Sequence, residues 1–291
     1  MRLISLKSSR LQSNLYIPVK RRVVFVLGAM TAVLLVSLIF ILFAKVPQAF
    51  SVVVPTESED LELIFFELNE GKVVVITIPK DTQMNLAMNR GTLRVKSVRR
   101  LIDSEKLPGR LLSDTVMKTL YLPVDYWAGR QHYGTFWGGD MPLPVRLTIF
   151  LQNIRGLKEE RVDLADTTVL TKERLKDGED GYVVSGRLPL TLISLFAEPA
   201  ISSSQTAVRL VNGTGEPEYV LTDVASILEV LGAKPVPPLT VDAVDVDCLV
   251  RANDEYSRER IASVFDCSVS KETPEAFDIE LLVGSRFVER F

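Results

Sequence analysis

Residues 61–82, LELIFFELNEGKVVVITIPKDT, decide the fold of the part of the chain that contains them. Two runs rich in β-branched and aromatic residues, 61–68 and 72–78, flank the tripeptide Asn69-Glu70-Gly71. Asn and Gly tolerate the positive φ angles of a tight turn, so these three residues are typical of a hairpin connection. The stretch therefore predicts a strand, a tight turn and a second strand.

The residues that follow the hairpin combine helical and strand patterns. Residues 94–102 and 111–120 have helical spacing, with Leu112, Val116 and Leu120 four residues apart, and a Pro-Gly turn separates the two segments. Further elements are expected as strands over 145–151 and 182–185 and as a short helix over 191–196. A mixed α/β domain is therefore predicted over residues 61–200.

A second, smaller domain is expected at the C-terminus. The hydroxyl-rich segment ISSSQT, residues 201–206, is the best candidate for a boundary. The elements expected beyond it are a strand over 207–211, a turn over 212–217, a helix that ends at Gly232, a strand over 244–251, a helix that starts at Asn253-Asp254 and a strand over 278–283. The order β-α-β-β-α-β predicts an α+β sandwich over residues 207–291.

The N-terminal part contains an uncharged apolar stretch, residues 23–44, with the sequence VVFVLGAMTAVLLVSLIFILFA. As a helix it would reach about 33 Å at roughly 1.5 Å per residue, enough to cross a hydrocarbon core of about 30 Å. A helix satisfies its own backbone in lipid. The stretch predicts a single transmembrane helix.

The charges beside this stretch predict its orientation. Lys20, Arg21 and Arg22 precede it and Lys45 follows it, so the positive-inside rule places the tail 1–22 in the cytoplasm and the rest outside the cell membrane. The alternative is a cleaved signal peptide, which usually has a shorter apolar region of about 7 to 15 residues. Residues 45–60 are expected to be a tether, with one strand over 51–54.

Composition and charge limit the class of protein. The chain has 291 residues, of which 47% are hydrophobic and 24% charged, a globular composition long enough for two folded units. The first 22 residues carry six basic and no acidic side chains, which leaves 28 basic against 37 acidic residues in the remainder. An acidic body argues against nucleic acid as a partner, because a nucleic acid requires a basic surface.

Two cysteines, Cys248 and Cys267, are separated by 18 residues. Outside the cytoplasm such a pair can oxidise, and a bridge over this span would contribute about 3 kcal/mol of stability. The alternative is that both are small buried apolar residues. His132 is the only histidine and the chain has no CxxC spacing, so no metal site is predicted.

Two parts of the sequence are similar to one family of bacterial envelope proteins. VRLVNGTGEP at 208–217, LEVLGA at 228–233 and the terminal DIELLVGSRFVERF resemble the LytR C-terminal domain. ELNEGKVVVITIPKDTQM at 67–84 and LYLPVDYW at 120–127 resemble the opening of the LytR-CpsA-Psr catalytic domain. The resemblance implies a cytoplasmic N-terminus, one membrane helix and an extracytoplasmic body.

The resemblance also implies an activity. Members of this family transfer polymers from polyprenyl pyrophosphate to peptidoglycan, with arginines on the pyrophosphate and carboxylates that hold a divalent cation. Here Lys80 replaces the motif arginine and Asp81 is retained, while Leu61-Glu62-Leu63 stands where the family has an Asp-Thr segment, with Asp60 one position out of register. A one-residue shift points a strand side chain to the other face, and the family's Asp-x-x-Arg-x-x-Arg spacing is absent from the sequence.

These departures favour a degenerate domain that binds or helps to assemble a cell-wall glycan, with peptidoglycan or an envelope glycopolymer as partner and no cofactor. The alternative is an active phosphotransferase that moves a polyprenyl-pyrophosphate-linked glycopolymer to peptidoglycan, in which Lys80 replaces the arginine and Asp81 helps to hold Mg²⁺. No residue is assigned as catalytic, since no nucleophile motif accompanies His132.

Two groups of residues are candidates for binding. Lys80 and Asp81 end a strand, and a basic group follows them that could hold pyrophosphate or another anion; its members are Arg90, Arg94, Lys96, Arg99 and Arg100. The alternative is a solvated helix face. Residues 126–140 contain Trp127, His132 and Trp137, whose rings could stack on sugars, rest at a lipid interface or cap the core of a hairpin.

Overall fold

A computed structural model describes residues 27–28, 30–31, 46–132, 135–217, 221–274 and 276–291. The chain divides after Val46, and Pro47–Phe291 forms one compact unit. The predicted membrane helix, residues 23–44, falls for the most part outside the described residues. Within the described part, no helix has both the length and the apolar character needed to cross a membrane.

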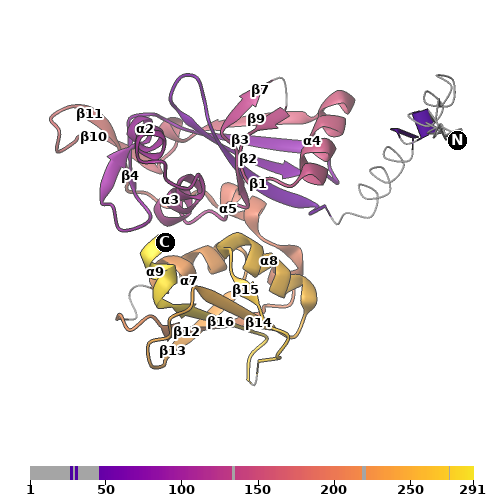
Figure 1. Ribbon diagram of the computed structural model, residues 1–291. Coiled ribbons are helices and arrows are strands. Elements are labelled where there is room, and N and C mark those ends of the chain that lie inside the picture. The colour runs from indigo at the N-terminus through magenta and orange to yellow at the C-terminus, as the bar shows by residue number, and fades with distance from the viewer. Residues whose placement is uncertain (1–26, 29, 32–45, 133–134, 218–220, 275) are drawn as a thin grey trace, which may run out of the picture. The chain divides into compact units, whose positions relative to one another are not determined.

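The predicted hairpin forms the centre of a five-stranded sheet with the order β6-β1-β2-β3-β9 (Figure 1). Its strands are β1 Ala49–Pro55, β2 Leu61–Glu67, β3 Lys72–Ile78, β6 Tyr126–Trp127 and β9 Lys158–Asp163. β2 and β3 are antiparallel, with Leu61 opposite Ile78 and Glu67 opposite Lys72, as the hairpin predicts. Gly71 in the turn has a φ angle of +61°, which residues other than glycine rarely adopt. β1 falls within the range predicted as a tether, and it extends the strand expected over 51–54 by two residues at its start and by one at its end.

The two faces of this sheet pack against different helices. Alternate residues of β2 and β3, such as Leu63 and Ile76, are fully buried in the main core with residues of α2 Val95–Glu105 and α3 Arg110–Leu120. The intervening residues, such as Phe66 and Val75, lie on the other face, beside α4 Leu143–Arg155. Strand periodicity of two produces this division, and Figure 1 shows α4 well separated from α2 and α3.

The strand predicted over 145–151 is wrong, because this segment lies within α4. Val145 and Ile149 are the buried residues and are four apart, which is helical spacing. The prediction failed because the run VRLTIFL is apolar on more than one face of the helix, and an apolar run of this length cannot be assigned from periodicity. Pro142 in an extended conformation precedes the first turn and Gly156 follows the last.

The remaining elements of this part complete its α/β character. A four-stranded sheet has the order β10-β11-β4-β5, and β7 pairs with β8 as a separate hairpin. The bounds are β4 Thr82–Asn85, β5 Thr92–Arg94, β7 Arg130–His132, β8 Thr135–Trp137, η1 Leu164–Asp166, β10 Leu170–Arg174, β11 Asp180–Val184, α5 Leu190–Phe196 and α6 Pro199–Ser202. The helices predicted over 94–102, 111–120 and 191–196 are confirmed as α2, α3 and α5.

The C-terminal residues form a sheet of their own with the order β13-β12-β16-β14-β15. The elements are β12 Ala207–Gly213, α7 Thr222–Val230, β13 Lys234–Thr240, β14 Cys248–Ala252, α8 Glu255–Phe265, β15 Ser268–Val269, β16 Ile279–Gly284 and α9 Ser285–Arg290. The predicted order β-α-β-β-α-β is present, with β15 and α9 added, and β13 is the strand for which the sequence predicts no range. β13 has the sequence KPVPPLT and lies at an edge, where prolines are tolerated. β14 begins at Cys248, later than the predicted Val244.

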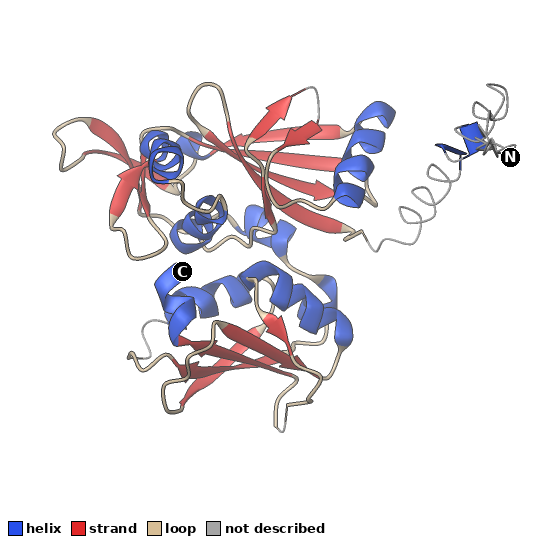
Figure 2. Ribbon diagram, in the orientation of Figure 1, coloured by secondary structure: helices blue, strands red, loops and turns tan. Residues whose placement is uncertain are grey.

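The segment predicted as a domain boundary, residues 201–206, is folded into the compact unit. It spans the end of α6 and the turn that leads to β12, and Ile201 is fully buried. Figure 2 shows α8 and α9 on the side of the C-terminal sheet that faces the α/β part. A division into two domains at this point stays a prediction.

One buried arginine joins the C-terminal sheet to the first sheet. Arg260 of α8 forms an ion pair through Nη1 with Oδ1 of Asp125, and its Nε donates to Glu198 Oε2 at 3.2 Å. Asp125 lies just before β6 and also accepts a hydrogen bond from the backbone N–H of Ser51 in β1 at 2.8 Å. The side chains of Arg260, Asp125 and Glu198 are 12%, 2% and 10% exposed. Arg260 therefore links α8 to β1 through Asp125.

Replacing Arg260 by Ala is expected to lower the free energy of unfolding by about 3 to 5 kcal/mol, because the carboxylates of Asp125 and Glu198 stay buried without their partner. Guanidinium unfolding of residues 47–291 measures the change. Glu259→Ala, an exposed position on the same helix, is the control and should change stability by no more than about 0.5 kcal/mol. Similar stabilities for the two variants would contradict the structural role of Arg260.

Candidate functional site

Lys80 and Asp81 lie between β3 and β4, where the sequence predicts that a strand ends. The Lys80 side chain is exposed, while its backbone is held on both sides. Its N–H donates to Asp60 Oδ1 at 2.7 Å, and its carbonyl accepts a hydrogen bond from the N–H of Lys96 at 3.0 Å. Asp60, which stands one position out of register with the family pattern, thus positions the Lys80 backbone.

Arg94, predicted to bind an anion, is surrounded by acidic residues of its own chain. Its Nε and Nη2 donate to the two carboxylate oxygens of Asp177 at 2.9 and 2.8 Å. Its Nη1 donates to Asp81 Oδ1 at 3.1 Å and to the carbonyl of Asp180 at 3.0 Å. Asp177 belongs to the turn between β10 and β11, so Arg94 fastens this turn to the ends of β4 and β5. The residue is only 7% exposed.

Asp81, the retained acidic residue of the motif, is also paired. Lys96 Nζ lies 2.8 Å from its Oδ1, and Arg94 contacts the same oxygen. Hydrogen bonds from Lys96 and then Arg94 lower the pKa of Asp81 against the opposing effect of burial. The carboxylate is therefore ionised at neutral pH and bound to two cations of the same chain.

The other arginines of the predicted basic group are paired with acids as well. Arg90 pairs with Glu105, Arg99 with Asp103 at 3.8 Å, and Arg100 with Glu59 at 2.5 Å. The structure thus brings Asp81, Arg94 and Lys96 into one cluster, while Arg90 and Arg99 belong to separate ion pairs. Sequence reasoning missed Asp177, which lies 83 positions from Arg94, and no local pattern connects the two residues.

The aromatic candidates have different surroundings. Trp127 is half-buried in β6, and its ring covers Gly109 at the start of α3. The backbone N–H of Trp127 donates a hydrogen bond to Asp140 Oδ1 at 2.8 Å. This contact favours the interpretation that the Trp127 ring caps the core. His132 and Trp137 lie on β7 and β8 of the two-stranded hairpin, and their side chains fall outside the described part.

A solvent-open hollow lies on the α4 side of the first sheet. Its floor is apolar and includes Ile64, Phe66, Val75 and Ile149. At its polar rim Arg161 contacts Glu62 at 3.2 Å. The opposite face of β3 carries Ile78, two residues before Lys80. The side chains on that face are buried in the core. The hollow and the charge cluster are thus not parts of one pocket.

Comparisons with known proteins give only a weak structural similarity. No family model matches the chain, and no curated protein matches it. Solved structures similar to this chain include LytR-CpsA-Psr proteins such as TagT and TagV. The structure of TagT from B. subtilis is 13% identical, with a TM-score of 0.30, over 49% of this chain and 88% of TagT. That of TagV from B. subtilis is 9% identical, with a TM-score of 0.32, over 66% of this chain and 100% of TagV.

A further structure of TagT, described as holding bound octaprenyl pyrophosphate lipid, has 12% identity and a TM-score of 0.31 over 49% of this chain and 88% of TagT. Similarity at this level does not transfer a substrate or a catalytic residue to the chain.

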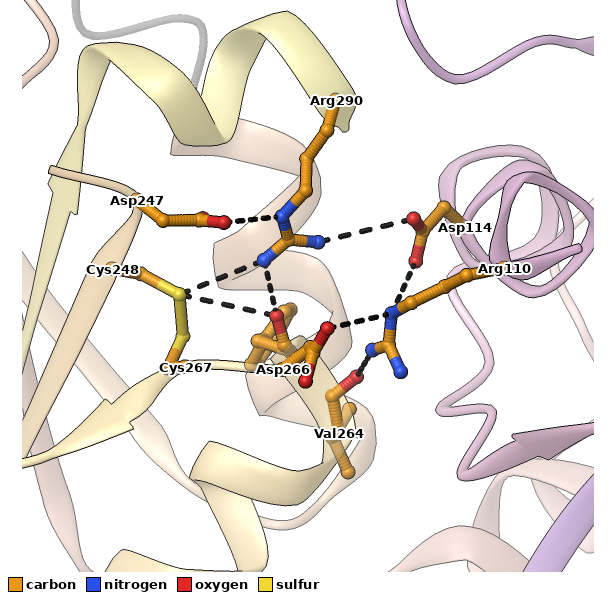
Figure 3. The surroundings of a disulfide bond; sticks show 9 residues. Arg110, Asp114, Asp247, Cys248, Val264, Asp266, Cys267 and Arg290 are labelled. Atoms are coloured by element: carbon orange, nitrogen blue, oxygen red, sulfur yellow. Dashed lines mark hydrogen bonds and ion pairs between the residues drawn. A yellow bond between two sulfur atoms is a disulfide. The ribbon is translucent and has the colours of Figure 1, made fainter. Parts of the chain in front are cut away.

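The predicted pair of cysteines forms a disulfide between Cys248 of β14 and Cys267, two residues beyond α8 (Figure 3). Arg290 of α9 lies beside this disulfide. Its Nε donates to Asp247 Oδ2 at 2.7 Å, and its Nη2 donates to the carbonyl of Phe265 at 2.6 Å. Nη2 also lies 3.7 Å from the sulfur of Cys248. The disulfide and Arg290 together hold the C-terminal end of α8 against β14 and α9.

This region also contacts α3 (Figure 3). Arg110 donates through Nη2 to the carbonyl of Val264 at 2.8 Å, and its Nε lies 3.4 Å from Asp114 Oδ1. Arg290 Nη1 lies 3.8 Å from the other oxygen of Asp114. The Asp114 side chain is 4% exposed. Burial raises its pKa to about 6, against the opposing effects of Arg110 and Arg290.

The raised pKa of Asp114 makes stability depend on pH. Between about pH 4 and pH 6 the folded chain binds more protons at this site than the unfolded chain, so the free energy of unfolding falls as the pH rises. Asp114→Asn removes this titration. The free energy of unfolding of the wild type minus that of Asp114→Asn should fall by about 3 kcal/mol as the pH rises from roughly 3.5 to 7.

Guanidinium unfolding of residues 47–291 with the disulfide intact, repeated across this pH range, measures the difference. Asp103→Asn is the matched control, since the Asp103 side chain is 72% exposed on α2, and its stability difference from the wild type should stay nearly constant. A difference for Asp114→Asn that is flat or that rises with pH is the contrary result.

Proposed function

We propose that this chain is a single-pass membrane protein of the bacterial cell envelope, whose extracytoplasmic body binds or helps to assemble a cell-wall glycopolymer without transferring it. The apolar stretch 23–44 and the basic residues before it support the anchor and the orientation. The resemblance of residues 207–291 to the LytR C-terminal domain supports the envelope role. The disulfide between Cys248 and Cys267 fits an oxidising compartment.

The observation that carries the non-catalytic proposal is the ion pairing of Arg94 and Asp81. A metal-assisted transferase built on this motif needs a carboxylate available to a cation and cationic groups available to pyrophosphate. In this chain Lys96 and Arg94 bind the Asp81 carboxylate, and the two oxygens of Asp177 bind the Nε–Nη2 edge of the Arg94 guanidinium. These residues therefore satisfy one another and stabilise the turn between β10 and β11.

The exposed Lys80 side chain is the part of the motif suited to binding. An ammonium is a point charge on a flexible stem, which can contact phosphate groups along a polymer without fixing one of them in a reactive geometry. Lys80 stands beside a cluster whose charges are already compensated. Its contribution is therefore attraction of an anionic polymer, and not activation of a leaving group.

The alternative of an active phosphotransferase is favoured by one observation, the hollow beneath α4. Part of its lining is apolar, as a polyprenyl chain requires, although charged residues such as Arg161 also line it. However, the strand residues that line this hollow point to one face of the sheet, and the core near Lys80 lies on the other face. A lipid held in the hollow would leave the motif residues on the other side of the sheet.

Residues 46–291 can be tested for both activities with a polyprenyl pyrophosphate and magnesium, and by sedimentation with purified wall sacculi that retain their anionic polymers. Co-sedimentation without turnover is expected. Lys80→Ala should weaken co-sedimentation several-fold, because an exposed cation is lost, whereas Arg99→Ala, which removes a cation already paired with Asp103, should have a smaller effect. Turnover that disappears in Lys80→Ala would establish the transferase instead.

A further inference from the structure

α4 exposes an apolar stripe on the side that does not face the sheet. Leu143, Phe150, Leu151 and Ile154 are 71%, 40%, 47% and 68% exposed, whereas Val145 and Ile149 are buried. At about 100° per residue the four exposed residues and the half-buried Leu147 share an arc of roughly 100°. The arc continues along the whole helix. We call these five residues the α4 stripe.

Single exposed apolar residues are ordinary on protein surfaces, but a contiguous stripe is not. A helix that covers one face of a sheet normally turns polar residues to solvent. In α4 the exposed arc is as apolar as the buried one, and this is also why its sequence resembles a strand. The α4 stripe therefore indicates a surface that is covered by something in the working protein.

The charges on α4 indicate the chemistry of that partner. The helix contains Arg146 and Arg155 and no acidic residue, although acids outnumber bases in the chain beyond residue 22. The two arginines stand on opposite edges of the arc, at about 100° per residue. An apolar arc bordered by arginines is the pattern of a helix that lies in the interface of an anionic membrane.

Arg146 turns its Nε to the carbonyl of Met141 at 2.8 Å, so Arg155, which is exposed near the end of the helix, is the better placed of the two for a lipid headgroup. Long cationic side chains commonly extend from an apolar surface to reach the polar layer above it.

The position of α4 in the fold agrees with such a partner. Ile149 of α4 and Phe66 of β2 line the same hollow, and the ring of Phe66 stacks on that of Phe50 with centroids 5.1 Å apart. Phe50 is the second residue of β1. In the sequence, only four residues separate the end of the apolar stretch 23–44 from the start of β1. α4 thus lies at the end of the compact unit where the chain enters it.

We propose that the α4 stripe rests on the bilayer that holds the anchor, with its apolar residues at the boundary between headgroups and acyl chains and Arg155 among anionic headgroups. This inference rests on the proposed membrane anchoring. The contact gives α4 a partner for its exposed apolar arc. It also keeps the sheet face with the hollow close to the lipid surface, which restricts how the body can turn on its tether.

The full-length chain in vesicles of phosphatidylglycerol and phosphatidylethanolamine tests this proposal. An environment-sensitive fluorophore is attached at Ile154→Cys, with the disulfide left oxidised, and its quenching by lipids that carry a nitroxide on the acyl chain is measured. The matched control is Leu239→Cys, since Leu239 is also an exposed apolar residue, 45% exposed, on edge strand β13. Adding Phe150→Asp to the Ile154→Cys chain tests the stripe itself.

Quenching at position 154 is expected to be at least about twofold stronger than at position 239, because an interfacial helix lies roughly 5 to 10 Å into the headgroup boundary, and Phe150→Asp should reduce it. Equal quenching at the two positions overturns the proposal while the chain still floats with the vesicles. Energy transfer between labelled copies without lipid quenching also overturns it, in favour of a second copy as the partner. A chain that does not float with the vesicles refutes the anchor and the α4 contact together.

Discussion

The structure depends on one buried guanidinium. Arg260 pairs with Asp125 and Glu198, and all three side chains are largely removed from water. Removing charges from water is costly, and the cost is offset only while the pairing is complete. Asp125 is in turn bonded to the backbone N–H and the hydroxyl of Ser51 in β1. The arrangement of α8 against the first sheet is therefore determined by a set of polar bonds that cannot be broken singly without leaving a buried charge.

A second set of contacts supports the same interface. The carbonyl of Val264 near the end of α8 accepts a hydrogen bond from Arg110 of α3, and Lys118 Nζ of α3 donates to the carbonyl of Phe291 at 2.8 Å. The disulfide and Arg290 fix the segment that presents these groups. The C-terminal sheet is thus attached to the α/β part through helices α3, α8 and α9, and the segment 201–206 does not act as a free linker.

The same use of charge explains why the motif residues favour a structural role. Arg94 and Asp81 are the residue types that a pyrophosphate site would contain. However, the Arg94 guanidinium donates two hydrogen bonds to Asp177, in the turn between β10 and β11. A buried cation needs acidic partners, and here the chain supplies them itself. Among the residues of the motif that the structure describes, the exposed Lys80 side chain is left for an external ligand.

Local patterns in the sequence predicted local structure well. The 61–78 hairpin, α2, α3 and the strand-turn-helix after Ala207 were predicted because periodicity and turn residues act over a few positions. α4 was missed because its second apolar face, the α4 stripe, hides the helical period. The charge pairs were not predictable, since Arg94 and Asp177 are 83 residues apart and Arg260 and Asp125 are 135 apart. Their proximity is a result of the tertiary fold.

The Arg260 network makes residues 47–291 one cooperative unit if its buried charges hold the two sheets together. Hydrogen exchange of this fragment in increasing denaturant, read separately for peptides from β1 and β2 and from β12 and β16, tests it most directly. The account predicts that both sets lose protection at the same denaturant concentration. Protection that persists in β12 and β16 after β1 and β2 have exchanged would show that the two sheets unfold independently, and would contradict it.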